Sequence, residues 1–228
     1  MKKLFIFATA VALISFASCS GDGKKTDGSD STKTKDSTTE TSTTSGKYQL
    51  KSGIVTMTSE TMGMTQAMTI YFDDNGSKEC VETIGEMDMG MAGKIKMHQL
   101  SITKDGYMYN LDMTAKTGTK TKITTSGKQQ DIDFSNMTDE LMKQMKITKQ
   151  GTEVVMGKTC DKYTMDDPTL KMKSTYCVWN GIALKSEIDM AGIVAKVTAT
   201  KIEENATIPA EKFEIPKDIK ITEMKGMK

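Results

Sequence analysis

Few side chains of this sequence could do chemistry on a substrate. His98 is the only histidine, so any Ser-His-Asp or Cys-His relay would depend on it, and no G-x-S-x-G or H-E-x-x-H pattern surrounds it. The carboxylate pairs 166–167 and 203–204 fall at expected turns and strand ends, where solvated charges are common. No glycine-rich phosphate loop and no zinc-ligand spacing is present. We therefore expect a protein that is not an enzyme and needs no cofactor.

Methionine is the residue type that could bind a ligand, with 20 copies among 228 residues. Because side chains alternate along a strand, methionines that share one parity point to one face. Such a face could simply fill the core, line an adaptable apolar cavity, or bind Cu(I) through soft thioethers. The cavity interpretation takes Met62, Met64, Met68, Met87, Met89, Met91, Met113 and Met142. The copper interpretation takes Met87, Met89, Met91, Met97 and His98.

Cys19 ends an N-terminal segment that reads MKKLFIFATAVALISFASC. Two lysines begin it, and its apolar stretch 4–14 is too short for a membrane span of about 20 residues. Residues 16–18, Phe-Ala-Ser, resemble the lipobox that precedes the modified cysteine of bacterial lipoproteins. The resemblance implies that residues 1–18 are a removed signal peptide and that acyl chains on Cys19 anchor the protein to a membrane. The alternative is an ordinary secretory signal with a chance cysteine.

A polar tether is expected to follow, over residues 19–47. Its segment 20–46 contains only Ser, Gly, Asp, Lys, Thr and Glu, which have nothing apolar to bury. As a flexible coil this segment would average about 30 Å end to end. Ser31 and Ser37 lie in Asp-Ser-Thr triplets that resemble the O-glycosylation sequon of Bacteroidetes, which implies modification at both.

The rest of the chain, 48–228, has a length typical of one domain with a core of its own. The whole sequence balances 31 basic residues against 30 acidic ones, and every basic residue is Lys. Nucleic-acid binding normally requires a basic stripe with Arg contacts, so this class of partner is excluded. After residue 19 no segment is apolar for long enough to cross a membrane, so the lipid would be the only anchor.

Short segments rich in β-branched, aromatic and Met residues, separated by turn signals such as Asp-Asn-Gly at 74–76, predict antiparallel hairpins. One amphipathic helix is expected at 134–145. The expected strands are 54–58, 68–72, 79–84, 95–103, 107–113, 152–165, 172–179, 183–190 and 194–202. A long antiparallel sheet with a helix packed on it is the simplest architecture.

Three cysteines remain beside Cys19, an odd number. If Met165 and Met172 face each other across the loop 166–171, the same register places Cys160 directly opposite Cys177, within disulfide range. That register predicts a Cys160–Cys177 bridge on the solvent side of the sheet, with the opposite face in the core. Two reduced, buried thiols are the alternative.

Several segments resemble LolA/LolB-like lipoprotein domains, including the group called DUF4412. The resemblance lies in 71–76 (YFDDNG), 157–163 (GKTCDKY), 178–187 (VWNGIALKSE) and 208–216 (IPAEKFEIP), and it covers most of 48–222. It implies a half-open barrel, in which one curved antiparallel sheet is closed by short helices around an apolar cavity. Relatives carry lipoprotein acyl chains or bind other lipids. The chain has one evident helix and lacks the cavity Arg of the chaperone member, so the resemblance favours lipid binding over lipoprotein trafficking as such.

The sequence therefore predicts an envelope lipoprotein, anchored most simply in the outer membrane on its periplasmic face or at the cell surface. It would bind an acyl chain or lipid in the half-barrel. The alternatives are a Met-rich Cu(I)-binding lipoprotein and a surface adhesion or assembly module with no small ligand.

Overall fold

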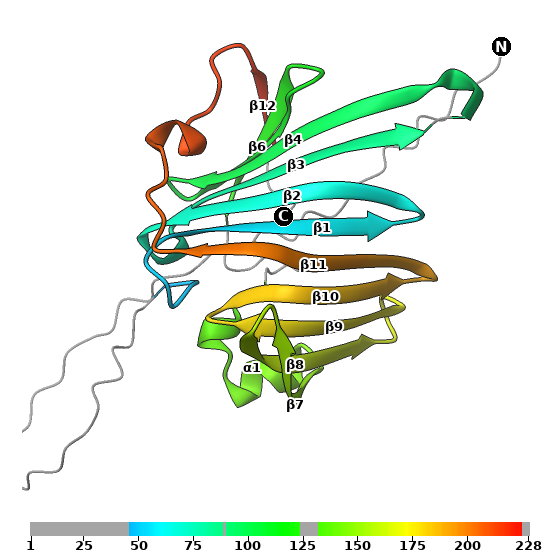
Figure 1. Ribbon diagram of the computed structural model, residues 1–228, viewed down its shortest axis with the longest axis vertical. Coiled ribbons are helices and arrows are strands. Elements are labelled where there is room, and N and C mark those ends of the chain that lie inside the picture. The colour runs from blue at the N-terminus through cyan, green and yellow to red at the C-terminus, as the bar shows by residue number, and fades with distance from the viewer. Residues whose placement is uncertain (1–45, 89, 124–131, 225–228) are drawn as a thin grey trace, which may run out of the picture.

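A single large sheet of twelve strands forms the domain, as seen in a computed structural model that describes residues 46–88, 90–123 and 132–224 (Figure 1). The sheet is strongly curved and does not close, so it forms the half-open barrel that the sequence predicts. Its strand order is β12-β6-β5-β4-β3-β2-β1-β11-β10-β9-β8-β7. β1 lies in the middle beside β11, so two runs of consecutive hairpins extend from the centre, one from β1 to β6 and the other from β11 to β7.

The N-terminal half of the sheet contains β1 (Gly53–Thr61), β2 (Met64–Asp73), β3 (Lys78–Asp88), β4 (Lys94–Lys104), β5 (Tyr107–Asp112) and β6 (Thr117–Lys122). The C-terminal half contains β7 (Ile147–Val155), β8 (Lys158–Asp167), β9 (Met172–Trp179), β10 (Ile182–Met190) and β11 (Ile193–Glu204). β12 (Lys220–Met224) returns to the edge at β6 and pairs with it in parallel, the one exception to the antiparallel pattern among the described strands.

Two-residue turns join several of these strands. Met62 (φ 52°) and Gly63 (φ 77°) connect β1 to β2, and Met156 (φ 52°) and Gly157 (φ 74°) connect β7 to β8. Positive φ at both central residues is the geometry that matches the twist of a hairpin. Residues 152–165, predicted as one strand, are therefore the β7–β8 hairpin instead. A Met before Gly gives a weaker turn signal than Asn-Gly, which is why the pattern concealed this turn.

The predicted helix 134–145 is broken into two short pieces. A 3₁₀ turn, η3 (Phe134–Asn136), is capped by Asp133, and α1 (Asp139–Gln144) begins after Thr138, whose hydroxyl accepts from the backbone N–H of Leu141. Met137 between them is extended. None of the helices among the described residues is long and apolar enough to span a bilayer.

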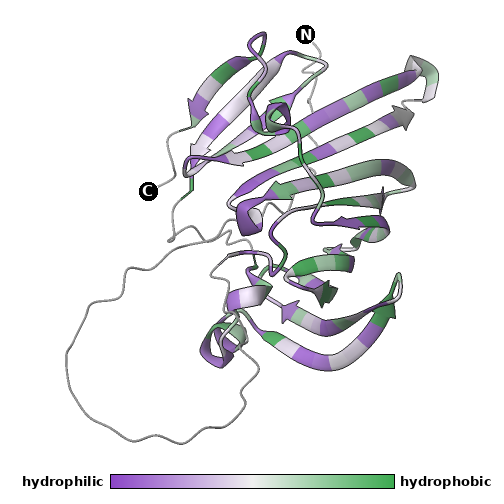
Figure 2. Ribbon diagram, turned by 60° about the vertical axis from the view of Figure 1, so that its left-hand side comes forward, coloured by the Kyte–Doolittle hydropathy of each residue, from purple (hydrophilic) through white to green (hydrophobic). Residues whose placement is uncertain are grey.

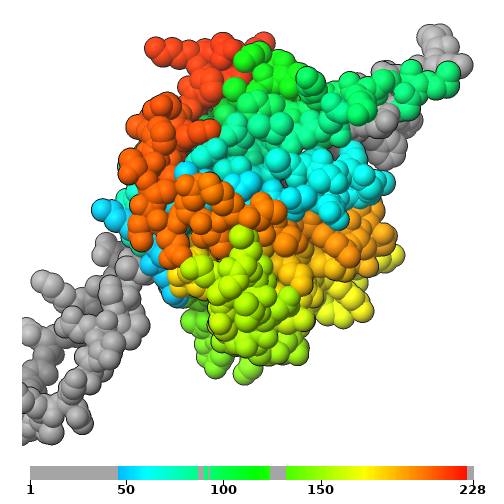
Figure 3. Space-filling view, in the orientation of Figure 1, coloured from blue at the N-terminus to red at the C-terminus, as the bar shows by residue number. Residues whose placement is uncertain are grey.

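Short helical segments cover both faces of the sheet. We call the inner face the one on which α1 and η3 lie. There, Phe134 of η3 and the half-buried Met142 of α1 pack against Tyr163, Met165 and Tyr176. We call the opposite face the outer face. In the N-terminal half, the segment with η4 (Ala210–Phe213), orange in Figures 1 and 3, lies on the outer face. There Phe213 packs against Cys80, Ile102 and Leu111. Two further 3₁₀ turns are η1 (Asp74–Gly76) and η2 (Gly90–Ala92).

The central cluster connects the two halves of the sheet. It joins Val55, Met57, Ile70 and Phe72 of β1 and β2 to Tyr48, which precedes β1. Figure 2 shows apolar and polar residues alternating along many of the strands, as a two-residue period requires. In β9 both parities are buried, because Tyr176 and Val178 pack under α1 while Cys177 between them belongs to the central cluster.

Candidate functional site: the inner face of the sheet

Strand pairing fixes which side chains share the inner face, because directly opposed residues point the same way. One row across the sheet contains Ile202, Val55, Ile70, Val81, Ser101, Asn110 and Thr119. The next row contains Ala199, Met57, Met68, Thr83, Gln99, Asp112 and Thr117. Both rows start apolar at β11 and become polar by β4. The inner face is thus divided into an apolar half and a polar half.

The apolar half is built from β11, β1 and β2. Met57 lies directly opposite Met68, and Val55 lies opposite Ile70. Near one end of these strands, the rings of Tyr48 and Phe72 pack with centroids 4.5 Å apart. Towards the other end the face is less covered, since Met68 and Val197 are only partly buried. Unbranched methionines on such a surface can adjust to ligands of different shape.

The polar half is built from β3 to β6 and carries hydroxyl and amide groups. Thr83, Ser101 and Thr103 are all buried. The hydroxyl oxygen of Thr83 has no hydrogen-bond partner among the described residues, and Thr83 is 5% exposed. A buried polar group without a partner normally costs free energy. Among the described residues the Ser174 hydroxyl on β9 is the other buried group of this kind, and Ser174, opposite Met165, lies on the inner face as well. A third row, with Ser59, Gln66, Gly85 and Met97, mixes polar and apolar groups.

One buried ion pair lies at the end of the inner face nearest the start of the domain. Lys47 Nζ lies 2.5 Å from Glu79 Oε2, and the hydroxyl of Tyr48 donates to the same oxygen. Gln49 N donates to Asn180 O, and Tyr48 N donates to Asn75 O. The segment 47–49 therefore spans from the β2–β3 turn to the β9–β10 turn. Lys47, which the sequence pattern assigns to the tether, is part of the folded core.

The methionines predicted to line one cavity are distributed over different parts of the molecule. Met68 borders the central cluster, Met113 packs on the outer-face cluster around Phe213, and Met142 packs in the cluster under α1. Met62 is 69% exposed in the β1–β2 turn, where parity no longer applies, and Met91 is exposed in η2. Met64 and Met68 do share the inner face. Met87 pairs with Ile95, and Met89 lies outside the described residues.

The structure places Met97 and His98, two of the residues predicted to bind copper, on opposite faces of the sheet. Met97 lies opposite Gly85 on the inner face, so His98 points to the outer face. There His98 Nε2 lies 2.8 Å from Glu82 Oε1. Within the described residues, no cluster of three or more His, Cys, Asp or Glu side chains could hold a metal ion.

His98 belongs to an outer-face cluster with Glu82, Lys212 and Tyr71. Lys212 Nζ lies 3.0 Å from Glu82 Oε2 and 4.2 Å from the centroid of the Tyr71 ring. Burial alone would raise the pKa of Glu82, but the hydrogen bonds from Lys212 and His98 outweigh it and hold this pKa below its ordinary value. The cluster ties η4 to β2, β3 and β4, which is a structural task.

The predicted register of the cysteines is wrong. The structure pairs Met165 with Ser174 and Cys177 with Lys162, two residues away from the predicted alignment. Cys160 and Cys177 therefore share the outer face as diagonal neighbours, whose Cα atoms are typically about 7–8 Å apart, beyond the usual disulfide range. Both are free thiols and both are buried, at 0% and 1% exposed, so the expectation of a solvent-side bridge is also wrong. The predicted loop 166–171 was too long, since β8 continues to Asp167.

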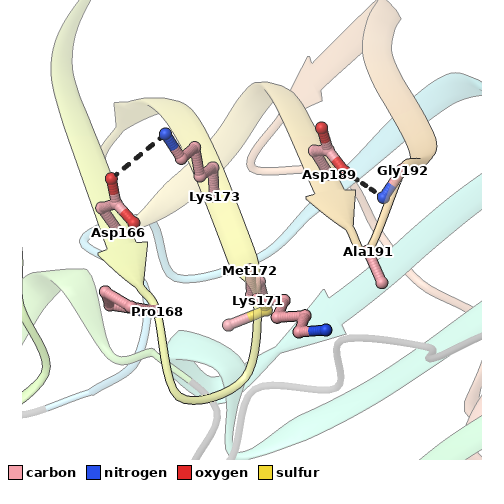
Figure 4. A pocket seen from close by; sticks show the side chains of 8 residues that line it. All are labelled: Asp166, Pro168, Lys171, Met172, Lys173, Asp189, Ala191 and Gly192. Carbon is pink, nitrogen blue, oxygen red and sulfur yellow. Dashed lines mark hydrogen bonds and ion pairs between the residues drawn. The ribbon is translucent and has the colours of Figure 1, made fainter.

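Two open clefts lie at opposite rims of the sheet, away from the two inner-face rows. The larger, about 440 Å³, lies between the β8–β9 loop and the β10–β11 turn (Figure 4). Its walls include the ion pair of Lys173 and Asp166, with Nζ and Oδ2 3.4 Å apart, and the turn in which Gly192 N donates to Asp189 Oδ1. The second, about 310 Å³, lies between Lys51, Asp73 and the segment 205–208. Their lining residues form ordinary turns and surface ion pairs.

The predicted lipidation site Cys19 and the glycosylation candidates Ser31 and Ser37 lie outside the described residues, as do the signal peptide 1–18 and most of the tether. These remain predictions.

Comparison with known proteins identifies the fold. No family model and no curated protein sequence matches this chain. An uncharacterized conserved protein from Thermus thermophilus matches with a TM-score of 0.52 at 9% identity, over 77% of this chain and 92% of that one. Weaker matches include a putative outer membrane lipoprotein-sorting protein domain from Vibrio parahaemolyticus, with a TM-score of 0.37, 10% identity, and coverage of 71% and 88%. LprF from Mycobacterium bovis matches with a TM-score of 0.34, 13% identity, and coverage of 73% and 92%.

Proposed function

We propose that this protein is a lipid-anchored envelope protein that binds a hydrophobic ligand, such as an acyl chain or a lipid, on the inner face of its half-barrel. The observation that carries the proposal is the apolar half of that face. Met57, Met68 and Val197 come from three neighbouring strands, share one side of the sheet, and lie on the same face as α1.

A ligand on this surface would gain from two features. The sheet is curved and does not close, and the neighbouring strands β11, β1 and β2 place Val197, Met57 and Met68 on one side of it. Met68 and Val197 are only partly buried, so a ligand could remove further apolar area from water. Each square ångström of apolar surface removed contributes about 25 cal/mol before the costs of binding.

The anchor gives the proposal its cellular setting. Acyl chains on Cys19 would hold the domain within tether reach of a bilayer, where hydrophobic ligands are concentrated. The tether enters the fold at Lys47, beside the β2–β3 and β9–β10 turns.

The test is a binding titration on the full chain carrying Cys19→Ser, so that no covalent lipid competes. The probe is the uncharged fluorophore N-phenyl-1-naphthylamine, whose emission rises in apolar surroundings. Met68→Glu places a charge on the inner face, and the matched control Ala67→Glu places the same charge on the exposed outer side of the same strand. We expect saturable binding by the parent and Ala67→Glu, and a loss of about tenfold or more in Met68→Glu.

Circular dichroism would establish that both variants keep the strand content of the parent. Absence of saturable binding by the parent chain itself, or equal binding by two folded variants, would overturn the proposal.

A further inference from the structure

The boundary between the two halves of the inner face indicates what kind of ligand the proposed site takes. In one row the change from apolar to polar falls between Val81 of β3 and Ser101 of β4. In the next row it falls between Met68 of β2 and Thr83 of β3. Neighbouring strands are about 4.8 Å apart, so a ligand lying across them would extend its chain over β2, β1 and β11 and its other end over β3 to β5.

The strands that form the polar end, β3 to β6, carry almost no net charge on the inner face, and Lys220 of β12, opposite Thr117, lies beyond them at the edge of the sheet. Every lysine of β1 to β6 falls on the outer face, namely Lys78, Lys94, Lys96, Lys104, Lys120 and Lys122. Two carboxylates occur on the inner face of these strands, and both are engaged. Glu79 pairs with Lys47 at 2.5 Å, and Asp112 Oδ1 accepts from the backbone N–H groups of Thr114 and Ala115 at 2.9 and 2.8 Å.

The other polar side chains on the inner face of β3 to β6 are neutral and can donate or accept hydrogen bonds. They are Thr83, Gln99, Ser101, Thr103, Asn110, Thr117, Thr119 and Thr121. An anionic headgroup such as a phosphate or carboxylate would lose its hydration here without meeting a cation from these strands. A headgroup of hydroxyls or esters would find donors and acceptors of matching polarity.

Thr83 lies at the boundary itself. Met68 is directly opposite on one side and Gln99 directly opposite on the other. Its hydroxyl is buried and has no hydrogen-bond partner among the described residues, so the fold holds a polar group there that its own described side chains do not satisfy. A ligand hydroxyl or ester oxygen at the boundary would supply that partner.

We infer that the inner face selects uncharged, hydrogen-bonding amphiphiles, of which monoacylglycerols are the simplest class, with the headgroup at Thr83 and the chain over Met68 and Val197. This inference rests on the proposed function, because it assigns the polar end of the same site. It predicts that the Thr83 hydroxyl lowers the stability of the ligand-free protein and raises its affinity for the ligand.

The experiment displaces bound N-phenyl-1-naphthylamine from the Cys19→Ser chain with 1-monooleoylglycerol or with oleate at about pH 8, where the carboxylate is ionised. Both lipids carry the same chain and are used below their aggregation concentrations. We expect the monoacylglycerol to bind about tenfold more tightly than oleate. In Thr83→Val, which keeps the shape and removes the hydroxyl, its affinity should fall about fivefold, and Thr83→Ser should retain it.

A second readout separates a ligand contact from a purely structural role. Because Thr83→Val removes an unsatisfied buried hydroxyl, the ligand-free melting temperature should rise by about 2–5 °C while monoacylglycerol affinity falls. Equal displacement by oleate, or unchanged monoacylglycerol affinity in Thr83→Val, would overturn the inference while fluorophore binding still supports the proposed function. If the parent chain does not bind the fluorophore, both are overturned.

Discussion

Lys47 and Glu79 form an ion pair, 2.5 Å from Nζ to Oε2, with side chains only 1% and 2% exposed. The pair joins the segment before β1 to the beginning of strand β3, and the Tyr48 hydroxyl donates to the same carboxylate oxygen. A charge this deeply buried is tolerated because its partner lies within hydrogen-bond distance. The pair therefore fixes the point at which the chain enters the fold.

Replacing one partner of this pair should destabilise the protein strongly. Lys47→Met leaves the Glu79 carboxylate buried without its cation, so we expect the free energy of unfolding in urea to fall by about 3–5 kcal/mol. The double variant Lys47→Met, Glu79→Leu should recover much of that loss. Lys94→Met serves as the control, because the Lys94–Glu86 pair is exposed and should contribute little. Equal losses in Lys47→Met and Lys94→Met would contradict the buried-pair account.

Gly181 and Gly192 are a matched pair of positions for testing how closely the segment around Lys47 packs against the β9–β10 turn. Both have positive φ, 81° and 89°, so alanine is strained at either. A Cβ at Gly181 would lie 2.4 Å from Lys47 O and 2.3 Å from Ser135 Oγ, whereas a Cβ at Gly192 would meet open space. We expect Gly192→Ala to lower the free energy of unfolding by about 1 kcal/mol and Gly181→Ala by several times as much. Comparable urea midpoints for the two variants would mean that Lys47 and Ser135 do not pack against this turn.

The half-open sheet could be predicted from the sequence because alternation and Gly-containing turns are local signals. β6 and β12 could not be predicted from the sequence. In β6, Thr117–Lys122, threonine alternates with Lys and Gly, so the strand has no apolar face. β12, Lys220–Met224, forms a strand because it pairs with the edge of β6. The division of the inner face could not be found either. It depends on which residues oppose one another over seven strands, and an error of two residues, as at Cys160 and Cys177, changes every neighbour.

The three described cysteines should behave as unreactive thiols. Burial raises the pKa of Cys80 to about 12, and burial together with the hydrogen bond to Glu153 raises the pKa of Cys177 to about 11. Burial also raises the pKa of Cys160. Since the thiolate is the reactive form, alkylation of the native protein by iodoacetamide should stay slow from about pH 8 to about pH 10, while a free thiol such as glutathione accelerates over that range.

The mass of the Cys19→Ser chain under non-reducing conditions checks the same point. We expect the mass of a chain with three free thiols, and alkylation at all three once the protein is unfolded in urea. A mass lower by a pair of hydrogen atoms would show a Cys160–Cys177 bridge. Such a bridge would require β8 and β9 to pair two residues away from the register in which Lys162 opposes Cys177. The thiol measurement thus tests which residues oppose one another across β8 and β9, whereas a shift of two residues would leave each side chain on its present face.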